Sequence, residues 1–198
     1  IDRDARARTR GAHDLGAPFG WMVGARKVID DADVVFVLNR AEHDAFRPLR
    51  GERHLERIAH GVKLERTSSD ARLAARARVP GLGAAPFVTV LARLDPMKSQ
   101  ETAIAAFLRA APREMHLLLV GAHVDRAYEH SLRALADGDP RIHFVGGVSP
   151  ATARALLAES RLALLTSRSE PFGIVLLEAW AEATPALVSD VGGLADQL

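Results

Sequence analysis

Two glutamates, Glu170 and Glu178, follow a short apolar run and flank a turn that contains Gly173. Glu170 lies on the loop itself, where its carboxylate could accept hydrogen bonds from the hydroxyl groups of a sugar. Gly173 would let a ligand approach the backbone, and the free amides at a helix start can meet phosphate oxygens. These residue types favour a ligand that carries both hydroxyl and phosphate groups.

Glu178 belongs to a stretch that is otherwise apolar and is expected to be a helix. A helix that is apolar nearly all round is usually buried, and a buried carboxylate is costly unless it is paired or hydrogen-bonded. The hydroxyl groups of a ribose could supply hydrogen bonds to the Glu178 carboxylate. A position on the one solvated stripe of the helix, or an ion pair with a core arginine, would explain the glutamate equally well.

Two basic residues, Arg93 and Lys98, stand at the end of an expected strand and the beginning of the next expected helix. Two cations beside helix N-terminal amides suit a diphosphate. An ordinary surface pairing with Asp95 or Glu101 explains them as well. Further along, Gly192 and Gly193 precede another helix and again permit close backbone approach, although loops use paired glycines for turn geometry at least as often.

Other kinds of site find little support in the sequence. There is no cysteine, which excludes thiolate zinc sites, disulfides and thiol nucleophiles. The histidines show no metal-ligand spacing, and neither a P-loop nor a serine nucleophile elbow is present. His13 is better explained as a surface or capping residue than as a catalytic one.

The elements that must position these residues alternate between strands and helices. The expected strands are 87–91, 116–120, 142–145, 162–165 and 186–188, and the expected helices are 99–110, 125–136, 150–158 and 172–183. This alternation predicts an α/β fold, a Rossmann-like doubly wound parallel sheet covered on both faces. Such sheets bind ligands beyond the carboxyl ends of their strands, at the point where the strand order reverses.

The region before residue 86 is organised differently. It offers strands at 33–38 and 55–59 with helices at 21–30 and 41–49, and then a polar and Pro/Gly-containing stretch. We therefore expect residues 1–63 to be the remnant of a second α/β domain, 64–85 to be an interdomain linker, and 86–198 to be the ligand-binding domain. The first residue is Ile, and the last residues are expected to begin another helix, so we expect a piece of a longer protein, truncated at both ends.

The composition limits the classes of partner that we expect this chain to bind. The net charge is +1 and charged residues make up 26% of the chain, so nucleic acid is not an expected partner. No apolar run approaches the roughly 18–20 residues that span a bilayer. The expected location is cytoplasmic, or peripheral at the inner face of the membrane, with any membrane association provided by parts outside this chain.

Several segments resemble the group 1 (family 4) glycosyltransferases of the GT-B fold. Glu170 and Glu178 match the family's Glu-x7-Glu motif, and the segment Arg93–Lys98 is similar to its Gly-Arg-Leu-x-x-x-Lys-Gly element. The remaining similar segments, in the family's order, are Ala32–Val35 with Asn39–Asp44, His60–Val62, Phe144–Gly146 and Ser189–Leu194.

The resemblance implies a retaining enzyme that moves a sugar from a UDP-, GDP- or ADP-sugar to an acceptor, without a metal or other cofactor. The acceptor, a saccharide, a lipid-linked molecule or a small molecule, is not identified by it. Arg93, Lys98 and Glu170 would be catalytic, the cations neutralising the diphosphate and Glu170 holding the donor sugar. The resemblance places donor binding at a further set of residues: Phe172, Gly173, Ile174, Glu178, Gly192 and Gly193.

The chain also departs from the family pattern. Ala92, Ser99 and Ala183 stand where the family usually has glycine, His60 replaces asparagine, and Trp180 replaces methionine. Two alternatives therefore stay open beside the transferase: a degenerate domain that binds a nucleotide sugar without turnover, and a GT-B epimerase or phosphorylase. The chain by itself is expected to have little activity.

Overall fold

The computed structural model describes residues 29, 31–50 and 54–198. His13 and most of the expected helix 21–30 lie outside this range. The chain forms two compact units: residues 1–60 together with 196–198, and residues 61–195. Within the described residues, no helix combines the length and apolar character that crossing a membrane requires.

The described part of the first unit is a small β-α-β arrangement. Strands β1 (Val35–Val37) and β2 (Leu55–Arg57) pair in parallel, and helix α4 (Arg40–Arg50) connects them. Asn39 accepts a hydrogen bond from the amide of Glu42, whose carboxylate accepts one from the amide of Leu38, so the first turn of α4 is capped from both directions. These elements confirm the expected strand–helix–strand order, with shorter strands.

The second unit is built on a parallel sheet with the order β5-β4-β3-β6-β7. The strands are β3 (Phe87–Leu91), β4 (His116–Val120), β5 (Ile142–Gly146), β6 (Leu162–Leu165) and β7 (Ala186–Val188). The chain builds outward from β3 to β5, returns to the other side of β3 as β6, and continues to β7. This confirms the doubly wound α/β prediction and places the reversal of strand order between β3 and β6.

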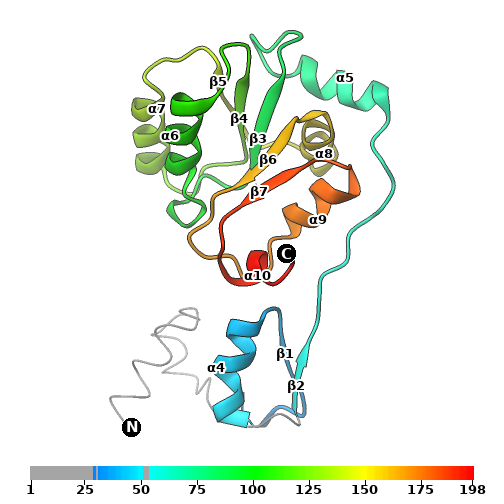
Figure 1. The fold of residues 1–198 in the computed structure, drawn as a ribbon. Coiled ribbons are helices and arrows are strands. Elements are labelled where there is room, and N and C mark those ends of the chain that lie inside the picture. The colour runs from blue at the N-terminus through cyan, green and yellow to red at the C-terminus, as the bar shows by residue number, and fades with distance from the viewer. Residues whose placement is uncertain (1–28, 30, 51–53) are drawn as a thin grey trace. The chain divides into compact units, whose positions relative to one another are not determined.

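Helices cover both faces of this sheet (Figure 1). One face carries α6 (Gln100–Ala110) and α7 (Arg126–Ala136), and the other carries α5 (Ser69–Ala77), α8 (Pro150–Glu159) and α9 (Ile174–Ala181). Side chains alternate along β4: Leu117 and Leu119 face α6 and α7, whereas Leu118 faces α5 and α8. The strands are therefore buried on both sides, as continuous apolar runs predict.

The expected linker 64–85 requires a correction, because much of it is folded onto the second unit. Helix α5 begins after Ser68, whose hydroxyl caps the amide of Ala71, and it packs against α8. The residues just before α5 are held by Glu182, whose side chain is fully buried. Its carboxylate accepts hydrogen bonds from the amide and hydroxyl of Thr67 and from Arg154 Nε at 2.6 Å.

The arginine in this cluster completes the attachment. Arg154 also donates to the main-chain carbonyls of Lys63 and Glu65, so one α8 side chain binds both the segment 63–67 and the end of α9. The composition of residues 64–85 did not predict this attachment, because the partners of the segment lie 89 to 115 residues further along the chain.

Two of the residues that replace family glycines keep a backbone conformation typical of glycine. Ser99, between β3 and α6, has φ of 50°, and Ala183, after α9, has φ of 59°. Left-handed backbone costs a side-chain-bearing residue about 1–2 kcal/mol. At these two positions the chain carries a side chain in the left-handed region that glycine favours.

Candidate functional site: a cleft at the switch point of the sheet

A cavity of about 160 Å³ opens at the carboxyl ends of β3 and β6, where the strand order reverses. Its walls are the ends of the two strands, the side chains of Lys98 and Glu170, and the beginning of α9 at Gly173–Val175. Ligands of doubly wound sheets bind at this topological position. The structure therefore brings four of the expected site residues together around one cavity: Lys98, Glu170, Gly173 and Ile174.

Lys98 and Glu170 form an ion pair on the cavity wall. Lys98 Nζ lies 2.5 Å from Glu170 Oε2, with only 22% and 15% of the two side chains exposed. The hydroxyl of Ser167 donates to the same carboxylate oxygen at 3.3 Å. Asp95 and Glu101 were the expected surface partners of Lys98, but Asp95 pairs with Arg93 and Glu101 pairs with Arg168. The ammonium group of Lys98 points into the cleft instead.

Local structure explains how Lys98 reaches this place. Asp95 accepts a hydrogen bond from the amide of Met97 and so caps the short helix η2 (Pro96–Lys98), which begins with proline. Ser99 ends η2 in the left-handed conformation and turns the chain into α6. Lys98 is thus the last residue of η2, at the turn that leads into α6.

Arg93 is placed differently from Lys98. Its side chain is 66% exposed, lies 3.6 Å from Asp95 and does not line the cavity. Its main chain is fixed by Gln100, which is wholly buried and donates Nε2–H to the carbonyl oxygen of Arg93 at 2.7 Å. The Arg93 guanidinium is therefore exposed beside Asp95, and its main chain follows the cavity-lining residue Ala92.

The glycines around the cleft make close contacts with protein. A Cβ atom at Gly173, where φ is 83°, would lie 2.4 Å from Leu194 Cδ2. A Cβ atom at Gly192 would lie 2.4 Å from the carbonyl oxygen of Glu170, and one at Gly193 would lie 2.3 Å from that of Pro171. In this structure the close approach that these glycines permit is between the loop after β6 and helix α10 (Gly192–Ala195), where a ligand was expected.

The start of α9 offers backbone amides to the cleft. Gly173 precedes α9 and makes no side-chain cap, and Ile174, the first helical residue, is partly exposed on the cavity wall. Phe172 is buried and anchors the turn. Amides at a helix N-terminus bind anions readily, which suits the expected contact of Gly173 and Ile174 with sugar or phosphate oxygens.

Glu178 lies one helix turn beyond the cavity and does not line it. Burial raises the pKa of its carboxyl group, and the charge of Arg154 opposes that rise. Within the described residues its carboxylate has no hydrogen-bond partner or ion pair in the protein. It is a half-buried acid that a polar ligand would stabilise, as the sequence led us to expect.

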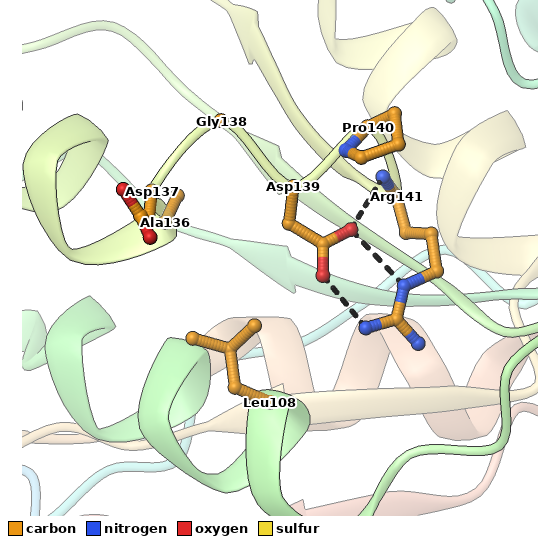
Figure 2. Close-up of a pocket in the computed structure, with 7 residues that line it drawn as sticks. All are labelled: Leu108, Ala136, Asp137, Gly138, Asp139, Pro140 and Arg141. Carbon is orange, nitrogen blue, oxygen red and sulfur yellow. Dashed lines mark hydrogen bonds and ion pairs between the residues drawn. The ribbon is translucent and has the colours of Figure 1, made fainter.

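A larger open depression, about 600 Å³, lies at the amino ends of the strands, before β5 (Figure 2). Asp139 and Arg141 pair with each other on one wall of it at 2.6 Å, and Asp139 also accepts a hydrogen bond from the amide of Arg141. These charges satisfy one another and close the turn after α7. The depression lies at the amino ends of the strands, so we assign it a structural role. No cluster of three metal-ligating side chains occurs in the described part of the chain.

Sequence reasoning missed two residues near the cleft. Gln100 occupies the buried stripe of α6 with Ala103, Ile104 and Phe107, and an amide on an otherwise apolar stripe was a signal that could have identified it. Thr166, which directly follows β6, bonds across to the loop that carries Lys98. No sequence signal indicated its partner.

The second unit has a Rossmann-like doubly wound fold with a cavity at its switch point, and comparison with known proteins identifies the family. Residues 76–198 match the family described as glycosyl transferases group 1. The chain belongs to this family.

Named relatives and solved structures agree with this assignment. A D-inositol 3-phosphate glycosyltransferase of Nocardia farcinica is 28% identical over 91% of this chain, and a glycogen synthase of Mycobacterium tuberculosis is 31% identical over 93%. The crystal structure of HepE from Anabaena in complex with UDP and glucose superimposes with a TM-score of 0.74, with 26% identity over 84% of this chain. The chain spans less than half of each of these proteins: 43%, 46% and 47%.

Proposed function

We propose that this chain supplies the donor-binding site of a retaining glycosyltransferase that uses a nucleoside diphosphate sugar. The observation that carries the proposal is the Lys98–Glu170 pair on the wall of the cavity at the switch point. An ammonium group, a carboxylate and helix N-terminal amides around one cavity match a ligand that has both phosphates and hydroxyl groups. The neighbour HepE is described as binding UDP and UDP-glucose.

In this proposal each polar group has a distinct role. Lys98 contacts the diphosphate and stabilises the negative charge that builds up on the departing nucleotide, and Arg93 adds charge from the edge of the cleft. Glu170 accepts hydrogen bonds from the donor sugar, and Glu178 from the ribose. The cavity is smaller than the 300–1,000 Å³ or so of a typical small-molecule site, so the nucleoside end of the donor extends beyond it.

Donor binding must also separate the Lys98–Glu170 pair or bridge it. A diphosphate can replace the carboxylate as the partner of Lys98, and sugar hydroxyls can replace the ammonium group as the partner of Glu170. The pair therefore keeps both charges compensated until a ligand with the complementary groups arrives.

The alternative of a degenerate domain without turnover rests on the replaced glycines. Ser99 and Ala183 keep the left-handed backbone that glycine would provide, so the loops that they shape retain their course. This observation favours a functional donor site over a decayed one. Retention of configuration, independence of metal and a cytoplasmic location are parts of the proposal, and the acceptor remains open.

The test is a titration of the chain with UDP, GDP and ADP and their glucose conjugates, followed by calorimetry and NMR. Lys98→Met and Glu178→Ala should each weaken the binding of the preferred nucleotide, by about tenfold or more, because each removes a charge-assisted hydrogen bond. Arg113→Ala is the matched control, because Arg113 is an exposed cation just before β4, at the amino end of that strand and away from the cavity at the carboxyl ends.

Three possible results distinguish a donor site from a general charge effect and from the absence of a donor site. Selective weakening in Lys98→Met and Glu178→Ala, with Arg113→Ala unchanged, would support the donor site. Equal weakening in Lys98→Met and Arg113→Ala, with unchanged or tighter binding in Glu178→Ala, would indicate a general charge effect. No binding by the folded parent would reject the proposal for this chain.

A further inference from the structure

Two loops lie next to each other at the switch point and are joined by hydrogen bonds. The first follows β3 and carries Lys98, and the second follows β6 and carries Glu170. Thr166 Oγ1 lies 3.0 Å from the carbonyl oxygen of Lys98 and 3.0 Å from that of Ser99. The amide of Arg168 donates to the carbonyl oxygen of Met97 at 2.8 Å.

The two side chains in this junction differ in what they contribute. The guanidinium of Arg168 reaches Glu101 at 2.7 Å, but it is 65% exposed, and exposed ion pairs of this kind stabilise little. Thr166 is half-buried, and its hydroxyl donates to the main chain of Lys98, whose ammonium group lines the cavity. The Ser99 carbonyl has a second donor in the amide of Thr102, so loss of the hydroxyl falls mainly on the Lys98 carbonyl.

The position of the Lys98 main chain decides where its ammonium group can reach. The lysine side chain is long and flexible, and fixing it in one geometry costs about 2 kcal/mol of rotamer entropy. A main chain that is displaced or mobile raises this cost and lets the ammonium group leave the cavity wall for solvent. A hydroxyl that fixes the carbonyl of the same residue works against that loss.

We infer that Thr166 is a positioning residue, which holds the main chain of Lys98 from the neighbouring strand so that its ammonium group meets the donor diphosphate. The effect on the diphosphate rests on the proposed function, whereas the effect on the ammonium group does not. Thr166 also lines the cavity, but its hydroxyl donates to the two carbonyl oxygens, and the inferred role runs through that contact. It acts through Lys98 alone, and this distinguishes it from a residue that merely stabilises the start of α6.

The test compares Thr166→Val, which keeps the shape and removes the hydroxyl, with Thr166→Ser, which keeps the hydroxyl. The first readout is the acetylation rate of Lys98 by acetic anhydride, measured by mass spectrometry relative to the exposed Lys63 of the same molecule. The ratio should rise several-fold in Thr166→Val, because the ammonium group leaves its partner Glu170 more often. Thr166→Ser should resemble the parent.

The second readout is the affinity for whichever of UDP, GDP and ADP binds the parent. Thr166→Val should weaken that affinity by about threefold to fivefold, less than Lys98→Met does, because the ammonium group keeps part of its contact with the diphosphate. Thr166→Ser should weaken it by less than about twofold. In a Lys98→Met background the Thr166→Val change should have an effect of less than about twofold, since the residue on which Thr166 acts is absent.

An unchanged acetylation ratio in Thr166→Val would overturn the inference, and so would equal weakening of affinity in both backgrounds, which would indicate a purely structural role. If the parent binds none of the nucleotides, the proposed function fails, and the acetylation ratio alone still decides whether Thr166 holds Lys98.

Discussion

The amide of Gly193 donates a hydrogen bond to the carbonyl oxygen of Glu170 at 2.8 Å. The loop that carries the site carboxylate is therefore supported from behind by the start of α10. Because the contact is between two main chains, a side chain at either neighbouring glycine would separate them. The two glycines and the glutamate, which the sequence presents as separate binding residues, form one structural unit.

Replacing Gly192 with alanine should displace the Glu170 loop. The new Cβ atom would lie 2.4 Å from the Glu170 carbonyl oxygen, and the residue already has φ of 45°. Gly138→Ala is the matched control, since Gly138 has φ of 70° with no atom within 4 Å of its Cβ position.

We expect Gly192→Ala to lower the free energy of unfolding by about 2–4 kcal/mol and Gly138→Ala by about 1–2 kcal/mol, measured by urea denaturation. Equal losses in the two variants would show that backbone strain alone, without the contact to Glu170, explains the effect.

Replacing Ala183 with glycine should stabilise the protein. Ala183 is exposed and has φ of 59°, so glycine removes the strain of a left-handed alanine without removing a packing contact. The greater freedom of glycine in the unfolded chain offsets part of this gain, which leaves about 0.5–1 kcal/mol. Ala106→Gly, on the exposed face of α6, should instead cost about 1 kcal/mol. A loss of stability in Ala183→Gly would contradict the assigned conformation.

Glu182→Gln should destabilise the protein in a pH-dependent way. Burial by itself would raise the pKa of Glu182, but hydrogen bonds from Thr67 and Arg154 outweigh it and hold the pKa below its usual range. A carboxyl group with a lowered folded-state pKa adds stability above its unfolded-state pKa, and this contribution is lost as the pH falls through the folded-state value.

We therefore expect Glu182→Gln to lose about 3 kcal/mol at pH 7, where it breaks a buried ion pair, and progressively less below about pH 4.5. Glu159→Gln is the control, because Glu159 pairs with Arg76 at a partly exposed position and should lose less than about 1 kcal/mol. A constant difference from pH 7 to pH 3 would argue against the assigned charge state.

The stacked pair His116 and His143 predicts a second pH effect, in a higher range. Their rings are joined by a hydrogen bond of 2.8 Å at the amino ends of β4 and β5. Burial lowers the pKa of both, assisted by the charge of Arg141 at His116 and by His116 at His143; Asp139 and the Pro80 carbonyl oppose these effects.

Because the unfolded chain then binds more protons than the folded one, stability should fall as the pH drops below about 6.5. His143→Asn should reduce this slope between pH 7 and pH 5.5, as measured by denaturation at each pH. A slope that is the same in parent and variant would show that other groups cause it.

Strand positions were predictable because buried parallel strands are short apolar runs, and Phe87–Leu91 and Leu162–Leu165 are read directly from residue type. Ser149 before Pro150 likewise identified the start of α8. Partners far apart in sequence were not predictable in this way. The attachment of Thr67 to Glu182 joins positions that no local pattern relates.

The same distinction between local pattern and distant contact applies to the candidate site. Lys98, Glu170 and Gly173 were predicted as site residues because each lies between the end of a strand and the helix that follows it, where ligands of such sheets bind. Thr166 follows a strand as well, but its importance depends on which carbonyl its hydroxyl meets. The glycines were identified for the right property, close approach, and what they approach in this structure is the protein's own backbone.

Ser99 and Ala183 show that a sequence motif can record torsion angles rather than residue types. A pattern search that demands glycine at both places would reject this chain, whereas a search on backbone geometry would accept it. A residue with a side chain can occupy such a turn at a cost of about 1–2 kcal/mol, which the rest of the fold must offset. Relatives dismissed for lacking such glycines merit re-evaluation by conformation.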